Sequence, residues 1–219
     1  MYTRHNSAEL PLRISVLTLL VLMCSLQTQP LSILNKPARE NQLWNCNFDK
    51  NACHFRNQYN LARFNRFYSP TAPFYGQRSV LVLDLSTQNA RKFPGARLIS
   101  HYFPAKYSNA CLYINYLLVG SAPRAFYVIQ QDKENKCIFA DENEQRTNSW
   151  RQVQLQLDLT DGDPRFFIEA QYETNLFNRQ EMPGYIAVSL FSYSFGNCER
   201  NQANNCFADM NNLQVPSPK

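Results

Sequence analysis

Cysteine is the residue type in this 219-residue chain whose number and spacing most directly suggest chemistry. Six of its seven cysteines lie beyond residue 40, at separations of seven, 58, 26, 61 and eight positions. Structural zinc sites use cysteine pairs with about two to four intervening residues, and these six cysteines contain no such pair. An even number of cysteines in an oxidising compartment predicts disulfides, so we expect three, with the pairing left open by sequence alone. The six are Cys46, Cys53, Cys111, Cys137, Cys198 and Cys206.

The seventh cysteine, Cys24, lies in an uncharged apolar run that follows two arginines and covers residues 14–26. This arrangement is typical of a secretory signal peptide, and the run is shorter than the roughly 20 residues of a transmembrane helix. We therefore expect a signal peptide over residues 1–29, cleaved between positions 25 and 29. The mature chain would then be exported and would have no transmembrane segment. An uncleaved signal anchor is the alternative.

Candidates for acid–base catalysis are few. Beyond the signal segment the chain contains two histidines, His54 and His101, and neither belongs to an H-E-x-x-H or G-x-S-x-G motif. Asp158 and Glu169 lie on neighbouring predicted strands, as a glycosidase's two carboxylates would, but the strand pattern places Asp158 on a polar face. We therefore expect no enzymatic activity, no cofactor and no metal. An enzyme with an unrecognised carboxylate pair is the alternative.

Short apolar runs separated by Pro, Gly, Asn and Asp dominate the chain from residue 42 onward. The clearest pattern spans residues 150–159, where Val153, Leu155 and Leu157 alternate with polar residues, as in a half-buried strand. No window of about 12 residues shows a helical stripe. Several short strands with turn residues between them predict an all-β fold, an antiparallel β-sandwich or jelly roll. Further strands are predicted over residues 79–85, 96–101, 111–119, 125–131, 165–171 and 185–191.

Composition and charge exclude several classes of protein. With 44% hydrophobic and 18% charged residues, the chain is not generally disordered. The net charge of +5 is spread along the chain without a run of five Lys or Arg residues, so we expect no nucleic-acid partner. The segment 63–75 is crowded with Arg, Phe and Tyr, which favours protein recognition, although these rings could instead fill the core. The candidate partner-binding residues are Arg63, Phe64, Arg66, Phe67 and Tyr68.

Several segments, in order, resemble the MAM domain family, whose extracellular modules are named for meprin, neuropilin and a receptor-type tyrosine phosphatase. The cysteine-containing segment 46–53 resembles the opening of these domains, and residues 111–120 resemble one of their strands. Residues 184–187 and 196–198 resemble their closing segment. The residues that carry this resemblance are Cys46-Asn-Phe-Asp49, Cys53, Ala96-Arg-Leu-Ile-Ser100, Cys111-Leu-Tyr-Ile-Asn-Tyr116, Gly120, Trp150, Phe167-Ile-Glu169, Gly184-Tyr-Ile-Ala187 and Gly196-Asn-Cys198.

The resemblance covers the chain from about Trp44 to Cys198 and implies a jelly-roll β-sandwich. It also implies two of the disulfides and leaves the remaining two cysteines to pair with each other, or between two chains in a covalent dimer. In some members two aspartates near the closing segment help to hold a cation, but here Ser189 and Leu190 follow Val188, so we expect no metal. The two implied pairs are Cys46–Cys53 and Cys111–Cys198, and the two cysteines left over are Cys137 and Cys206.

The resemblance further implies a single-domain secreted member that acts without catalysis in adhesion or protein–protein interaction. Its partner would be an extracellular protein, a matrix component or a second copy of the chain. The expected location is extracellular, secreted or associated with the cell surface or matrix. A carbohydrate-binding module is the alternative. The expected regions are the signal peptide at 1–29, a polar leader at 30–42, the β-sandwich at 43–198 and a polar tail at 199–219.

Overall fold

The computed structural model describes residues 42–71, 74–93, 95–142, 148–174, 184–200 and 206. These residues belong to the second of two units, Arg39–Lys219, and the first unit, Met1–Ala38, lies outside the described residues. The expected signal peptide lies outside them as well, together with most of the expected leader and tail. In the described part of the chain, no helix is long and apolar enough to cross a membrane.

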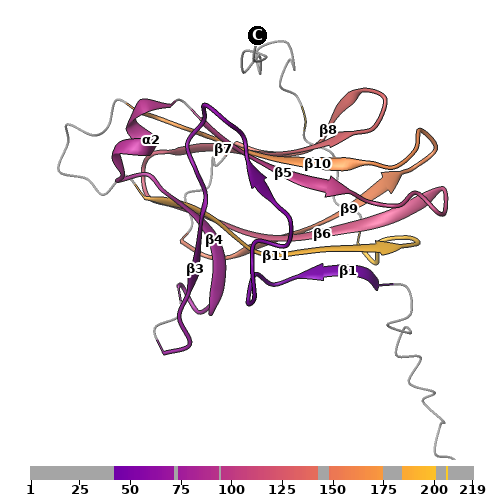
Figure 1. The fold of residues 1–219 in the computed structure, drawn as a ribbon, viewed down its shortest axis with the longest axis horizontal. Helices are drawn as coiled ribbons and strands as arrows, with labels where there is room; N and C mark the ends of the chain where they lie inside the picture. The colour runs from indigo at the N-terminus through magenta and orange to yellow at the C-terminus, as the bar shows by residue number, and fades with distance from the viewer. Residues whose placement is uncertain are drawn as a thin grey trace, which may run out of the picture. The chain divides into compact units, whose positions relative to one another are not determined.

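Two antiparallel sheets pack face to face, which confirms the predicted β-sandwich (Figure 1). Sheet A has the order β3-β4-β11-β6-β9, with β1 also beside β11, and sheet B has the order β2-β5-β10-β7-β8. The strands of sheet A are β1 (Gln42–Cys46), β3 (Asn65–Tyr68), β4 (Ser79–Asp84), β6 (Asn109–Val119), β9 (Arg151–Asp158) and β11 (Tyr185–Phe195). Those of sheet B are β2 (Arg56–Asn57), β5 (Gly95–Tyr102), β7 (Pro123–Gln131), β8 (Asn135–Asp141) and β10 (Arg165–Tyr172).

The alternation of apolar and polar residues predicted for β9 corresponds to its two faces, one buried between the sheets and one on the outside. Val153, Leu155 and Leu157 point between the sheets and are at most 2% exposed, while the intervening Gln side chains are on the outer face of sheet A. The partner strand β6 is apolar on both faces near its end, because Leu117 and Val119 are covered by side chains on the outer face. Burial on one or both faces therefore decides which strands show a clear period of two.

Two of the elements that the sequence analysis missed are β8 and α2, and neither has a long pattern. In β8, four consecutive buried residues, Cys137–Ala140, replace an alternation. Helix α2 (Gln88–Lys92) has five residues and is nucleated by Thr87, whose Oγ1 accepts a 3.3 Å hydrogen bond from the Ala90 amide. Strands β1, β2 and β3 were also not predicted as strands.

Three disulfides cross-link the described residues: the two pairs that the family resemblance implies and a third between the two cysteines left over. Cys46–Cys53 closes a loop after β1, and Cys111–Cys198 joins β6 to the segment that follows β11. The third disulfide, Cys137–Cys206, joins β8 to residue 206.

Candidate functional site

The five residues proposed from sequence as partner contacts do not form one surface. Phe64 is 3% exposed and belongs to the core, so it is not available to a partner. Arg66 is exposed, and its guanidinium donates to the backbone carbonyls of Phe48, at 2.7 Å, and of Asp49. The same guanidinium lies 5.3 Å from the centre of the exposed Tyr68 ring.

The other two candidates differ in their surroundings. Arg63 is exposed, and its backbone amide donates a 2.9 Å hydrogen bond to Asn89 of helix α2. Phe67 is half-buried on the outer side of β3, where its ring centre lies 5.7 Å from that of Phe74. Phe67 therefore belongs to a different surface from Arg66, its neighbour in sequence, because successive strand residues face opposite ways.

Aromatic side chains gather on the outer face of sheet A at its β3–β4 end. The rings of Phe74 and Tyr185 meet at 90° with their centres 5.4 Å apart, and the Tyr75 ring centre lies 5.0 Å from that of Phe74. These side chains cover the buried residues of β6 and β11 described above. We call this set the sheet A aromatic cluster; its members are Phe67, Phe74, Tyr75, Trp150 and Tyr185.

A hydrogen bond between distant segments fixes the rim of the cluster. The indole N–H of Trp150, just before β9, donates to the Tyr75 carbonyl at 2.8 Å. Tyr75 and Gly76 form a two-residue turn, closed by hydrogen bonds in both directions between Phe74 and Gln77. Their φ angles of 46° and 85° are those of a type I′ turn, where Asn and Gly are usual and a tyrosine is strained. Tyr75 is 46% exposed.

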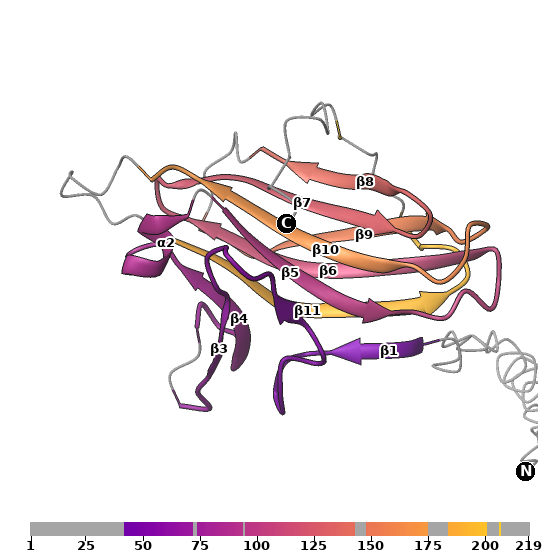
Figure 2. The same ribbon diagram turned by 45° about the horizontal axis from the view of Figure 1, so that its top comes forward.

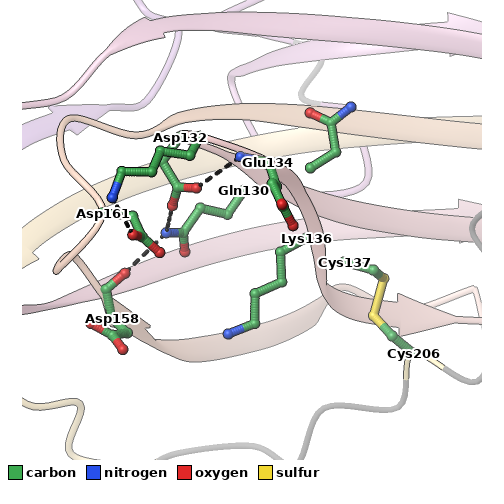
Figure 3. A pocket seen from close by; sticks show the side chains of 10 residues that line it. Gln130, Asp132, Glu134, Lys136, Cys137, Asp158, Asp161 and Cys206 are labelled. Carbon is green, nitrogen blue, oxygen red and sulfur yellow. Dashed lines mark hydrogen bonds and ion pairs between the residues drawn. A yellow bond between two sulfur atoms is a disulfide. The ribbon is translucent and has the colours of Figure 1, made fainter.

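A second feature is a polar hollow of about 620 Å³ between the β7–β8 and β9–β10 turns (Figure 3). The Lys133 ammonium lies 2.8 Å from the Asp161 carboxylate, and the Gln130 amide donates to Asp132 at 2.8 Å. The side chains of the hollow are therefore bonded to one another. Among the described residues, no group of three or more His, Cys, Asp or Glu side chains could hold a metal ion. The lining residues are Gln130, Asp132, Lys133, Glu134, Asn135, Lys136, Cys137, Asp158, Asp161 and Cys206.

The carboxylate pair considered from sequence is not a pair in space. Asp158 ends β9 in sheet A, whereas Glu169 lies on the outer face of β10 in sheet B. A backbone hydrogen bond from Thr160 holds the pKa of Asp158 below its usual value. Burial raises the pKa of Glu169, although the ion pair with Arg97 opposes that shift.

Of the two histidines, His101 contributes to packing, whereas His54 is exposed. The ring of His101 lies between Trp44 and Phe103, with centre-to-centre distances of 5.3 Å and 4.2 Å. Burial, with the nearby His54 as a second cause, lowers the pKa of His101. A neutral ring among aromatic neighbours has the surroundings of a core side chain.

Two antiparallel sheets with three disulfides define the chain as a disulfide-bonded β-sandwich module. The model of the MAM domain family (meprin/A5/mu) matches residues 46–188, and the chain belongs to this family, as its sequence motifs indicated. MAM domains are extracellular modules, and the disulfides are consistent with that setting.

The chain is similar to solved structures at low sequence identity. The K1 cleaved adhesin domain of Lys-gingipain from Porphyromonas gingivalis W83 is 8% identical, with a TM-score of 0.50 over 70% of this chain and 98% of that one. The CBM22-1 xylan-binding domain of Xyn10C from Paenibacillus barcinonensis is 11% identical, with a TM-score of 0.43 over 70% and 94%. The comparison with curated proteins gives no match. The similarity to the Lys-gingipain adhesin domain shows a shared fold and nothing about function.

Proposed function

We propose that this protein is a secreted, non-enzymatic adhesion or protein–protein interaction module that contacts its partner through the sheet A aromatic cluster. Membership of an extracellular module family supports the setting. The observation that carries the proposal is the cluster itself, which is held at the surface by the bond from Trp150 to Tyr75.

The cluster has the composition and the rigidity of a protein-binding hot spot. Trp and Tyr are enriched among the residues that contribute most to binding, because their rings bury large apolar areas and retain a polar edge. Here the rings are already packed against one another and the turn that carries Tyr75 is closed on both sides. A preformed surface loses little conformational entropy on binding.

The geometry of the rings favours a protein over a sugar. Sugar recognition by a sandwich face, as considered above, requires coplanar exposed rings. In the cluster, the Phe74 ring meets Tyr185 at 90° and Tyr75 at 69°. The most exposed rings elsewhere in the described ranges, those of Tyr59, Tyr68, Tyr102 and Tyr107, lie on both sheets and in loops. Rings at steep angles to one another offer no flat platform for the face of a pyranose, whereas they can insert into a pocket between the side chains of a protein partner.

Two measurements on the mature protein test this function. Sedimentation over a concentration series detects self-association, and immobilised protein incubated with its native extracellular fluid captures other partners. We expect at least one of the two to show specific association. The proposal fails when the folded protein stays monomeric and captures no cell-surface, matrix or secreted protein.

A further inference from the structure

Positive charge is concentrated in one part of the chain, contrary to the even spread expected from sequence. Residues 49–97 contain eight Lys or Arg residues and two Asp residues, a net charge of +6. Residues 98–219 contain ten Lys or Arg residues and 13 Asp or Glu residues, a net charge of −3. The overall value of +5 therefore conceals a strongly basic stretch.

This stretch folds along one edge of the sandwich. Strand β2 lies at one edge of sheet B and β3 at one edge of sheet A. Asn57 of β2 makes hydrogen bonds of 2.9 Å and 2.8 Å to the backbone of Phe64, just before β3. Figure 2 shows this indigo-to-purple segment running beside β5 and β4, with helix α2 at one end. We call five of the exposed cations on this segment and on α2 the basic edge; they are Lys50, Arg56, Arg63, Arg66 and Lys92.

Backbone and side-chain bonds hold the parts of the basic edge together. The amide of Arg63 is bonded to Asn89 of α2, the helix that ends at Lys92. The guanidinium of Arg66 reaches the Asp49 carbonyl, next to Lys50. Four of the five cations therefore stand on segments that are bonded to one another.

No ion pair among the described residues includes a cation of the basic edge, because the four ion pairs there involve other Lys and Arg residues. The two acids of the stretch bind neutral donors instead: Ser79 donates to the Asp49 carboxylate at 2.6 Å, and Ser86 donates to Asp84 at 2.6 Å. Exposed cations without acidic partners attract a polyanion over distances of about 10 Å or less.

We propose that the basic edge binds a linear sulfated polysaccharide. Three of its five cations are arginines, whose planar guanidinium matches the oxygens of a sulfate group. The neighbouring exposed side chains include the amides of Asn51, Asn60 and Asn65 and the separate rings of Tyr59 and Tyr68, so polar groups predominate beside the cations. A linear polysaccharide that carries several sulfate groups can contact separated cations at the same time. This ligand goes beyond the protein partner proposed above and uses a different surface.

The test compares two triple variants that each remove three positive charges. The first variant is Lys50→Gln/Arg56→Gln/Arg63→Gln. The matched control is Lys106→Gln/Lys136→Gln/Arg200→Gln, which removes three exposed cations from residues 98–219, outside the basic edge. Binding of the mature proteins to immobilised heparin is measured at physiological salt, with poly-glutamate as a second probe and circular dichroism as the check of folding. We expect the first variant to bind heparin about a hundredfold more weakly and the control to stay within about threefold of the wild type.

Equal losses in the two triple variants would show a general effect of net charge and would overturn the proposal. Stronger binding to poly-glutamate than to heparin would also overturn it and would assign the edge to an acidic protein. Should the triple variant not fold, the single variants Lys50→Gln and Arg63→Gln should each weaken heparin binding about fivefold; unchanged binding in both rejects the proposal. The basic-edge variant should still capture the protein partner, because that partner is proposed to bind the sheet A aromatic cluster. A failure of heparin binding can therefore be told apart from a failure of the proposed function.

Discussion

The phenol of Tyr116 donates a 2.7 Å hydrogen bond to the carboxylate of Asp141, and this bond joins the two sheets of the sandwich. Tyr116 lies on β6 of sheet A, and Asp141 ends β8 of sheet B. Arg151 of β9 contacts the same carboxylate oxygen. Burial, together with the bond to Asp141, raises the pKa of Tyr116, so the phenol remains a donor at every physiological pH.

Removal of this phenol should weaken the fold. In the Tyr116→Phe variant Asp141 loses a donor at a site that is largely shielded from water, so we expect the free energy of unfolding to fall by about 1–2 kcal/mol. Urea unfolding measures this loss. The control is Tyr113→Phe on the outward side of the same strand, which should change stability by less than about 0.5 kcal/mol. Equal losses in the two variants would contradict a specific role for the bond.

Glu169 should make the stability of the protein depend on pH. Its side chain is 5% exposed and paired with Arg97, and burial raises its pKa above the ordinary value of 4.5. A carboxyl with a raised pKa in the folded state stabilises the fold below its unfolded pKa and loses that contribution as pH rises through its folded pKa. The stability of the wild type relative to Glu169→Gln should therefore fall as the pH rises above 4.5. A relative stability that increases with pH would mean that the pair with Arg97 outweighs burial.

Gly184 is required by the start of β11. Its φ is +103°, and a Cβ at this position would lie 1.8 Å from the carbonyl oxygen of Val119. We expect Gly184→Ala to lower the free energy of unfolding by about 3 kcal/mol or more, because the neighbouring strand must move. Gly162 has a similar φ of +116° but open space around it, so Gly162→Ala should cost about 1 kcal/mol. Thermal unfolding of both variants tests this order, and a reversal would refute the steric argument.

The disulfides should contribute unequally. Cys111–Cys198 spans 87 residues and Cys46–Cys53 spans seven, so the chain-entropy model predicts losses of roughly 4–5 and 2–3 kcal/mol when each pair is changed to Ala. Denaturant unfolding of the two double variants measures the difference. Mass spectrometry of the mature protein should also show no free thiol, and a disulfide-linked dimer through Cys137 would contradict the intramolecular pairing.

The parts of the fold that could be predicted are those set by local pattern. The alternation around Leu155 identified β9 and its core side chains, whereas β8 was missed because its apolar residues are consecutive. Phe64 was offered as a contact because a segment rich in aromatics and arginines does not itself show which rings turn inward. Asp158 and Glu169 lie on successive strands, yet the chain changes sheets between them.

The candidate site could be found only in part. Phe67 was named from its neighbourhood in sequence, but Tyr75, Trp150 and Tyr185 come from three distant segments. They meet because β4 pairs with β11 and β11 pairs with β6, with Tyr185 opposite both Asp84 and Val119. Such a register depends on long-range strand pairing, which no local pattern specifies. The strained turn at Tyr75 leaves a weak signal in sequence, a Gly preceded by an aromatic residue where Asn is usual.

The most direct test of the proposed contact surface replaces one ring without disturbing its turn. Asn tolerates the positive φ of position 75, so Tyr75→Asn should keep the backbone and remove the exposed ring. Tyr107→Asn is the control, since Tyr107 is 53% exposed in the loop between β5 and β6, away from the cluster. Affinity for the captured partner, or the dimer constant if the chain binds itself, is measured for both variants. We predict at least tenfold weaker association for Tyr75→Asn and a change below about twofold for Tyr107→Asn; wild-type association in Tyr75→Asn would contradict the central claim.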